Sequence, residues 1–264
     1  MALTAAVESV GRVTRELIAP VGTGARFTGD VLRALRATRD WIPEFSTQAR
    51  SLGVGSLPIG IFIALFTGIV LALLASYSVG DVVPPYFVGT LVQKTVTLEL
   101  APVLTGLALA GRVGANIAAE LGTMRVTEQV DALETLTFDP LSYLVAPRVV
   151  ASAVMFPVVV GMAMLVGMVS GWIASLLILD LATPQFLKGV RFFFQDFDVR
   201  YGLVKSASFG AAVALIGCRA GLTTMGGAQG VGRSATRAVV ISAVMILVLD
   251  AFWALIWLTN RTLR

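Results

Sequence analysis

Two acidic residues stand out because each lies inside an apolar stretch of the sequence. Glu99 belongs to the segment TVTLELAP, and Asp250 belongs to the segment VMILVLDAFW. An ionised carboxylate is costly in hydrocarbon, so each of the two is expected to face a cation or a wet cavity. For Glu99 two interpretations stay open, a position that faces a wet cavity and a structural ion pair with Lys94 or Arg112. For Asp250, pairing or a cavity position is favoured over catalysis.

Groups for other kinds of chemistry are scarce in this chain. It has no histidine, a single cysteine, Cys218, and acidic residues scattered over separate segments. No imidazole base, intrachain disulfide, or cluster of metal ligands or of nucleophile and base can be assembled from them. The sequence therefore predicts no catalytic residue, no metal site and no cofactor on this chain. A polytopic membrane enzyme that acts on lipids is kept as the alternative function, and it would need such a cluster.

One glycine-rich segment, GAQGVGRS at residues 227–234, nearly fits the phosphate-binding pattern G-x-x-x-x-G-K-[ST], with Arg233 in place of the lysine. A phosphate loop follows an apolar strand, whereas this segment follows an expected membrane span. We therefore interpret its glycines as a cytoplasmic turn at which backbones approach closely, and not as a site for ATP. The chain also has no basic stretch interleaved with aromatic residues, so nucleic acid is not an expected partner.

The elements that position these residues are predicted to be membrane helices. Hydrophobic residues make up 56% of the 264 residues, charged residues only 14%, and the mean hydropathy is +0.85, which is typical of a membrane protein. Apolar runs predict five spans, at about residues 52–77, 86–110, 149–179, 201–216 and 238–258. The fourth has the shortest uncharged core, so a re-entrant segment is its alternative. We expect an all-α membrane protein with one transmembrane domain over residues 1–264.

Basic residues predict the orientation of these spans. Residues 1–50, 112–148 and 219–237 hold 13 of the 20 Lys and Arg residues, and that excess predicts a cytoplasmic N-terminus. Within residues 1–45, apolar side chains recur at helical spacing among arginines, which predicts an amphipathic helix in the membrane interface. A solvated cytoplasmic helix is the alternative. Residues 46–264 form the predicted transmembrane bundle.

The longest cytoplasmic connection joins the second and third spans and reads GRVGANIAAELGTMRVTEQVDALETLTFDP. Thr127 is the predicted N-cap of a short helix in it. The helix would carry acids three residues apart, at Glu128, Asp131 and Glu134, beside an apolar face of Val130, Leu133 and Leu136. Taken alone, this pattern favours a solvated connection.

Three segments carry a resemblance to a known family. The stretch ELAPVLTGLALAGRVGANIAAELGTMRVTEQVDALETL closely resembles the signature of the MlaE/YrbE permease family. The segment TTMGGAQGVGRSATRAVV resembles the part of that family before its last span, and SLGVGSLPIGIFIALFTGIVLAL resembles its first span. The resemblance covers most of residues 46–258, while residues 1–45 match only in character.

The resemblance implies an ABC transporter permease in the inner membrane of a bacterium. Members of the family dimerise, here as an expected homodimer, and bind a cytoplasmic ABC ATPase dimer that holds ATP and Mg. They work beneath a periplasmic ring of MCE-domain protein and move phospholipid or a similar lipid between envelope membranes. The short helix around residues 127–136 is then expected to couple the permease to its ATPase.

Two groups of site residues follow from this interpretation. A substrate pathway at the dimer interface is predicted to be lined by Leu71, Leu74, Tyr77 and Glu99, because acyl chains need an apolar wall and a headgroup needs polar anchors. ATPase coupling is predicted for Glu120, Arg125, Glu128 and Asp131. Glu120 and Arg125 would fix the connection, whereas Glu128 and Asp131 would meet the partner or stabilise the N-terminus of the helix.

Overall fold

The computed structural model describes residue 19 and residues 22–79 and 84–262. All regular secondary structure in these residues is helical. After a first helical segment at residues 22–34, the elements are α2 (Thr38–Leu52), η1 (Val54–Ser56), α3 (Leu57–Val79), α4 (Phe87–Thr95), η2 (Val96–Leu100), α5 (Ala101–Leu109), η3 (Ala110–Gly114), α6 (Ala115–Val126), α7 (Gln129–Thr135), η4 (Leu141–Val145), α8 (Ala146–Ile178), α9 (Thr183–Phe192), α10 (Asp196–Leu222) and α11 (Gly227–Thr262).

Five stretches of helix in the described residues are long and apolar enough to cross a membrane, as predicted. They are Trp41–Ser78, Phe87–Val126, Leu141–Ile178, Asp196–Leu222 and Gly227–Trp257. The second contains 40 residues, and at 1.5 Å per residue it is about 60 Å long, roughly twice the thickness of a hydrocarbon core. Helices therefore continue beyond the membrane, which explains why the predicted spans were shorter than the helices found.

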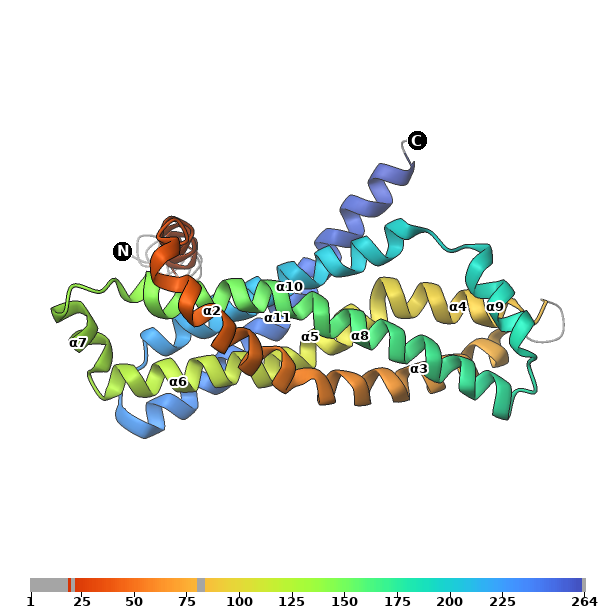
Figure 1. The fold of residues 1–264 in the computed structure, drawn as a ribbon, viewed down its shortest axis with the longest axis horizontal. Coiled ribbons are helices and arrows are strands. Elements are labelled where there is room, and N and C mark those ends of the chain that lie inside the picture. Colours follow the sequence, from red (N-terminus) through yellow and green to blue (C-terminus); the bar gives the residue numbers. More distant parts are fainter. Residues whose placement is uncertain (1–18, 20–21, 80–83, 263–264) are drawn as a thin grey trace, which may run out of the picture.

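Two connecting helices mark the opposite ends of the elongated bundle. In Figure 1, α7 lies at one end beside the described start of the chain, and α9 lies at the other. The last turns of α11 project away from the bundle. Within the predicted N-terminal segment, residues 1–18, 20 and 21 lie outside the described residues. The rest is helical at residues 22–34 and again from Thr38, and residue 45 falls inside α2 rather than at a helix end.

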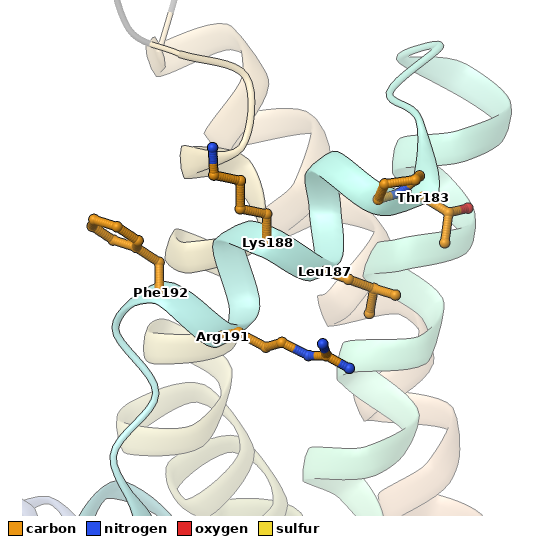
Figure 2. Close-up of a pocket in the computed structure, with 6 residues that line it drawn as sticks. Thr183, Leu187, Lys188, Arg191 and Phe192 are labelled. Atoms are coloured by element: carbon orange, nitrogen blue, oxygen red, sulfur yellow. The ribbon is translucent and has the colours of Figure 1, made fainter.

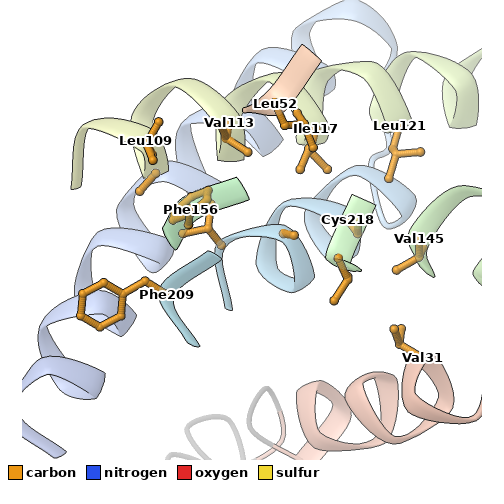
Figure 3. Packing of buried hydrophobic residues seen from close by; sticks show 14 of the residues in the cluster. Val31, Leu52, Leu109, Val113, Ile117, Leu121, Val145, Phe156, Phe209 and Cys218 are labelled. Atoms are coloured by element: carbon orange, nitrogen blue, oxygen red, sulfur yellow. The ribbon is translucent and has the colours of Figure 1, made fainter. Parts of the chain in front are cut away.

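The buried apolar side chains form two clusters along the bundle. The first joins the η3 and α6 region to α8 and α10 through residues such as Ile117, Phe156 and Phe209, as Figure 3 shows. The second joins α3, α4 and η2 to the other half of α8. α8 contributes side chains to both clusters and is therefore the central helix of the bundle.

Small residues bring the helices close together at two Gly-x-x-x-Gly pairs, Gly167 with Gly171 in α8 and Gly217 with Gly221 in α10. A Cβ atom on Gly171 would lie 3.2 Å from the carbonyl oxygen of Gly68 in α3, and one on Gly217 would lie 3.1 Å from that of Gly114. Contacts this tight leave no room for a larger side chain. The pair in α8 therefore packs on α3, and the pair in α10 packs on the η3 and α6 region.

The fourth span is one continuous helix and not a re-entrant segment. α10 runs from Asp196 to Leu222, although the sequence predicted only residues 201–216. From sequence, Lys205 limited the uncharged core of this span. In the structure Lys205 and Asp198 are both buried in the helix and paired with other spans.

Candidate functional site

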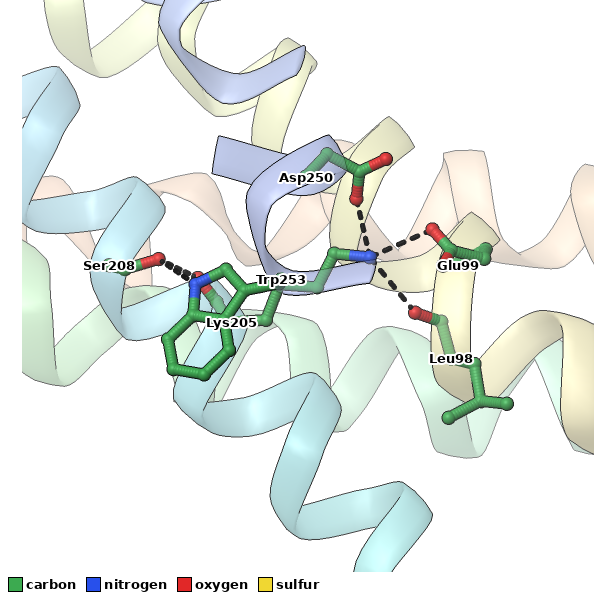
Figure 4. Close-up of polar contacts among 6 residues, drawn as sticks. All are labelled: Leu98, Glu99, Lys205, Ser208, Asp250 and Trp253. Atoms are coloured by element: carbon green, nitrogen blue, oxygen red, sulfur yellow. Dashed lines mark hydrogen bonds and ion pairs between the residues drawn. The ribbon is translucent and has the colours of Figure 1, made fainter. Parts of the chain in front are cut away.

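Lys205 is the centre of a charged cluster in the membrane-spanning part of the bundle. It comes from α10, its side chain is fully buried, and its Nζ lies 2.8 Å from Glu99 Oε2 of η2. The same Nζ forms an ion pair with Asp250 Oδ1 of α11 and donates a hydrogen bond to the carbonyl oxygen of Leu98 at 3.3 Å. Figure 4 shows these three contacts converging on one ammonium group.

The contact with Leu98 has a cause in the sequence. An α-helical residue donates its N–H to the carbonyl four residues earlier, and the residue four after Leu98 is Pro102, which has no N–H. The helix widens into the π-turn η2 over Val96–Leu100 at this place. The carbonyl of Leu98 is thus left without its usual helical donor, and Lys205 supplies a replacement.

Aromatic side chains enclose the cluster on one side. The Tyr201 ring centre lies 5.5 Å from Lys205 Nζ and 6.1 Å from the ring centre of Trp253. Trp253 donates its indole N–H to Ser208 Oγ at 2.9 Å, which ties α11 to α10. Tyr201 thus contacts the lysine by a cation–π interaction, and the hydrogen bond of Trp253 fixes the orientation of its ring next to Tyr201.

A second ion pair lies on the same face of α10. Asp198 is fully buried and pairs with Lys94 of α4, and it lies seven residues, or about two helical turns, before Lys205. The second span thus contributes Lys94 and Glu99, and α10 contributes their partners Asp198 and Lys205. The two pairs fix the register between α10 and the second span.

The Lys205 cluster opens on the outside of the single chain. Lys205 is fully buried, but the side chains of Glu99 and Asp250 are 45% and 24% exposed. One cation therefore faces two partly exposed acids, so the cluster has an excess of negative charge. Carboxylates at membrane depth need polar surroundings, and those exposed here can accept hydrogen bonds from a neighbouring molecule.

The partners suggested for Glu99 from sequence were wrong. Glu99 pairs with Lys205, whereas Lys94 pairs with Asp198. The expectation that Asp250 is paired was confirmed by its contact with Lys205. Sequence reasoning missed Lys205 and Asp198 because it treated charges in the fourth span as its limits. Their spacing of seven residues, which places both on one helical face, was a usable signal.

The other predicted pathway residues lie on α3 and face different ways. Leu71 is partly buried against the second apolar cluster. Leu74 is 56% exposed and Tyr77 is 87% exposed, so both point out of the bundle. The predicted cavity requires a second subunit, and it stays a prediction.

The predicted coupling residues lie at the α7 end and are tied together by ion pairs. Glu120 of α6 accepts a hydrogen bond of 2.6 Å from Arg148, whose side chain is almost fully buried at the start of α8. Arg125 pairs with Asp131, which ties α7 to α6. Glu128 is exposed and makes the turn between them.

The predicted N-cap of α7 was wrong. Thr127 ends α6, and its hydroxyl donates to the carbonyl oxygen of Thr123 at 2.8 Å. The residue before α7 is Glu128, which has a left-handed backbone with φ of 59° and makes no capping hydrogen bond through its side chain. The hydroxyl of Thr127 is used within α6, so it cannot cap the next helix.

Comparison with known proteins places these residues in a family. The family described as permease MlaE matches residues 45–256, which include the whole Lys205 cluster. The chain belongs to the MlaE permease family. It is 43% identical over 211 residues to a probable ABC transporter permease protein of Synechocystis sp., covering 80% of each chain. A probable ABC transporter permease protein of Rickettsia felis is 38% identical over 240 residues, covering 91% of this chain and 93% of the relative.

A plant protein is also related to this MlaE permease. The Arabidopsis thaliana protein trigalactosyldiacylglycerol 1, chloroplastic, is 34% identical over 220 residues, which are 83% of this chain and 63% of the plant protein. These matches and the five apolar helices identify the chain as a multi-pass ABC transporter permease.

Proposed function

We propose that this permease moves phospholipid or a similar lipid between envelope membranes, driven by ATP hydrolysis on a separate ABC ATPase dimer. It would act as a homodimer in a bacterial inner membrane, with its N-terminus in the cytoplasm and a ring of MCE-domain protein on the far side. ATP and Mg would be held by the ATPase, and no cofactor by this chain.

The observation that carries the proposal is the opening of the Lys205 cluster on the surface of the single chain. Glu99 is 45% exposed although it lies in a span, and a carboxylate there needs a polar neighbour. Either a second subunit or the headgroup of a lipid supplies one. α3 packs along α4 and α5, the helices on either side of η2, and exposes Phe62, Phe66 and Val70. An acyl chain beside these side chains would have the apolar wall that it needs.

The α7 end of the bundle supports a role for an ATPase partner. α7 projects from one end of the bundle (Figure 1), and Leu136 and Phe138 after it are 65% and 51% exposed. The pairs Glu120 with Arg148 and Arg125 with Asp131 tie this exposed element to α6 and α8. A partner that moves α7 would thereby move two spans.

The names of the relatives favour a transporter over the alternative, a membrane enzyme acting on lipids. Two are called probable ABC transporter permeases, and the plant relative carries the name of a glycolipid. In the described residues, no group of three or more acids and cysteines is placed to hold a metal ion.

The test is to coexpress the chain with the ATPase and the MCE protein of its source and to purify it in mild detergent. We expect the three chains to copurify, mass spectrometry to find retained phospholipid, and lipid to stimulate ATP hydrolysis. Glu99→Ala should reduce the retained lipid, whereas Glu134→Gln, an exposed acid beyond the spans, should not. A chain that purifies alone, or a complex that neither holds lipid nor responds to it, would refute the proposal.

A further inference from the structure

Three residues other than glycine have a left-handed backbone in the described part of the chain. They are Glu128 with φ of 59°, Thr137 with φ of 65° and Asp180 with φ of 50°. A β-branched residue such as Thr137 is the least suited to this conformation, because its side chain crowds the neighbouring backbone. Glu128 directly precedes α7, and Thr137 follows the end of α7 by two residues. Backbone strain is therefore concentrated at the two ends of this short helix.

The short connection after α7 imposes the left-handed conformation on Thr137. Its N–H donates to the carbonyl oxygen of Glu134 at 3.0 Å, and the N–H of Phe138 donates to that of Leu133 at 3.1 Å, so the chain folds back over the end of the helix. Glycine is the usual residue at the left-handed position of such a helix end. Asp139 comes next and accepts hydrogen bonds from the first backbone N–H groups of η4 through both carboxylate oxygens. Hydrogen bonds on both sides thus hold Thr137 in a strained state.

α7 itself is held loosely. Among its residues, all of which are described, only Val130 is buried. Its ion pair with α6 is exposed on both sides, and exposed ion pairs contribute little. Leu136 and Phe138, the neighbours of Thr137, are 65% and 51% exposed. α7 can therefore turn with little loss of packing, and a partner that covers these two apolar side chains would act directly on the backbone of Thr137.

The third strained residue lies next to a helix that is attached firmly. Asp180 precedes α9 at the opposite end of the bundle, and Figure 2 shows α9 lying across neighbouring helices. Phe186 of α9 is only 2% exposed, and Thr90 of α4 donates its hydroxyl to the carbonyl oxygen of Gly189 at 2.7 Å. Asp180 therefore combines a left-handed backbone with a fixed element, and it is the natural comparison for Thr137.

We propose that Thr137 is a strained hinge of α7, and that docking of the ATPase releases it from the left-handed conformation. Release would strengthen the association about tenfold, or about 1.4 kcal/mol, which lies within the usual cost of this conformation. The free chain would thereby store part of the energy of docking and would return α7 to its first position when the ATPase withdraws. The inference rests on the proposed function, because it needs an ATPase partner, and it gives a role to a residue outside the predicted coupling set.

The test compares Thr137→Gly and Thr137→Asn with the unmodified full chain in detergent. Glycine adopts the left-handed conformation freely, and asparagine adopts it more readily than threonine. Because relief of strain stabilises the free chain, the midpoint of thermal unfolding should rise from threonine to asparagine to glycine. Affinity for the purified ATPase, measured by biolayer interferometry, should fall in the same order, by about tenfold for Thr137→Gly. A residue that only maintains the fold would not give these opposite trends.

Asp180→Gly is the matched control. It relieves strain at the end of the bundle away from α7, so it should stabilise the chain and leave the affinity for the ATPase unchanged. The hinge is overturned if Thr137→Gly binds the ATPase as tightly as the unmodified chain, if it lowers the unfolding midpoint, or if Asp180→Gly weakens association equally. An unmodified chain that binds no ATPase refutes the proposed function and the hinge with it, so the two failures are told apart by the unmodified chain.

Discussion

Replacing Lys205 by methionine should destabilise the fold more than any single change of its acidic partners. Methionine keeps the unbranched apolar part of the side chain but leaves Glu99 and Asp250 facing each other without a cation, and the Leu98 carbonyl without its donor. Removing one member of a buried ion pair costs about 3–5 kcal/mol. Glu99→Gln should cost about 1 kcal/mol or less, because Glu99 is 45% exposed and Asp250 still neutralises the lysine.

The measurement is unfolding of the purified chain in detergent, followed by tryptophan fluorescence as denaturant is added. The triple variant Lys205→Met, Glu99→Gln and Asp250→Asn has no uncompensated charge left. It should therefore recover most of the stability lost in Lys205→Met alone. If Lys205→Met is no less stable than Glu99→Gln, or if the triple variant is no more stable than Lys205→Met, the cluster is not the structural ion pair described above.

Two further predictions concern the ends of the bundle. Glu128→Lys with Asp131→Lys should leave the free energy of unfolding within about 1 kcal/mol, because exposed ion pairs are weak, but should abolish association with the ATPase in a pull-down assay. Gly189→Ala should destabilise the chain by about 1–3 kcal/mol and displace α9, because its Cβ would overlap the backbone carbonyl of Tyr86 just before α4 and lie 3.1 Å from the backbone nitrogen of Thr90. Thermal unfolding and crosslinking between α4 and α9 measure this effect.

Each of these predictions has a matched control on the same chain. Asp196→Lys reverses an exposed acid at the α9 end and should not affect ATPase association. Gly232→Ala adds a methyl group where nothing lies within 4 Å, so it should be neutral or slightly stabilising. Normal ATPase binding by the Glu128 and Asp131 variant would move the coupling role elsewhere. The next candidate is the glycine-rich segment at residues 227–234, which was interpreted from sequence as a turn but forms the start of α11. Equal effects of the two glycine substitutions would contradict the close contact of α9 with α4.

The number of spans was predictable because it depends on composition over long windows. The uncharged runs at residues 51–80 and 149–179 are long enough to cross a bilayer whatever they pack against. Helix packing at Gly171 and Gly217 was predictable for a similar reason, because glycines four residues apart form a smooth face on any helix. These properties are local, and no knowledge of the partner helix is needed to recognise them.

The pairing of charges was not predictable in the same way. Glu99 and Lys205 lie 106 residues apart in sequence, and their contact depends on which helices are neighbours in the bundle. Lys94 and Arg112 are closer in sequence, but both lie on the same span as Glu99, and Lys94 pairs with Asp198 instead. The effect of Pro102 was not predictable for the same reason. Pro102 leaves the carbonyl of Leu98 without a helical donor, but the sequence does not show that Lys205 of another helix donates to it.

The packing of α10 gives the proposed coupling a physical route through the molecule. A Cβ atom on Gly221 would lie 3.0 Å from the carbonyl oxygen of Ala118, and one on Gly217 would lie 3.1 Å from that of Gly114. Backbones in such contact cannot move toward each other, and a close-packed interior transmits displacement instead of absorbing it. A push on α7 would enter α6 through Arg125 and Asp131, then pass to α10 across these glycines. Because Lys205 lies on α10, the displacement would reach the one cation that holds Glu99 and Asp250 together.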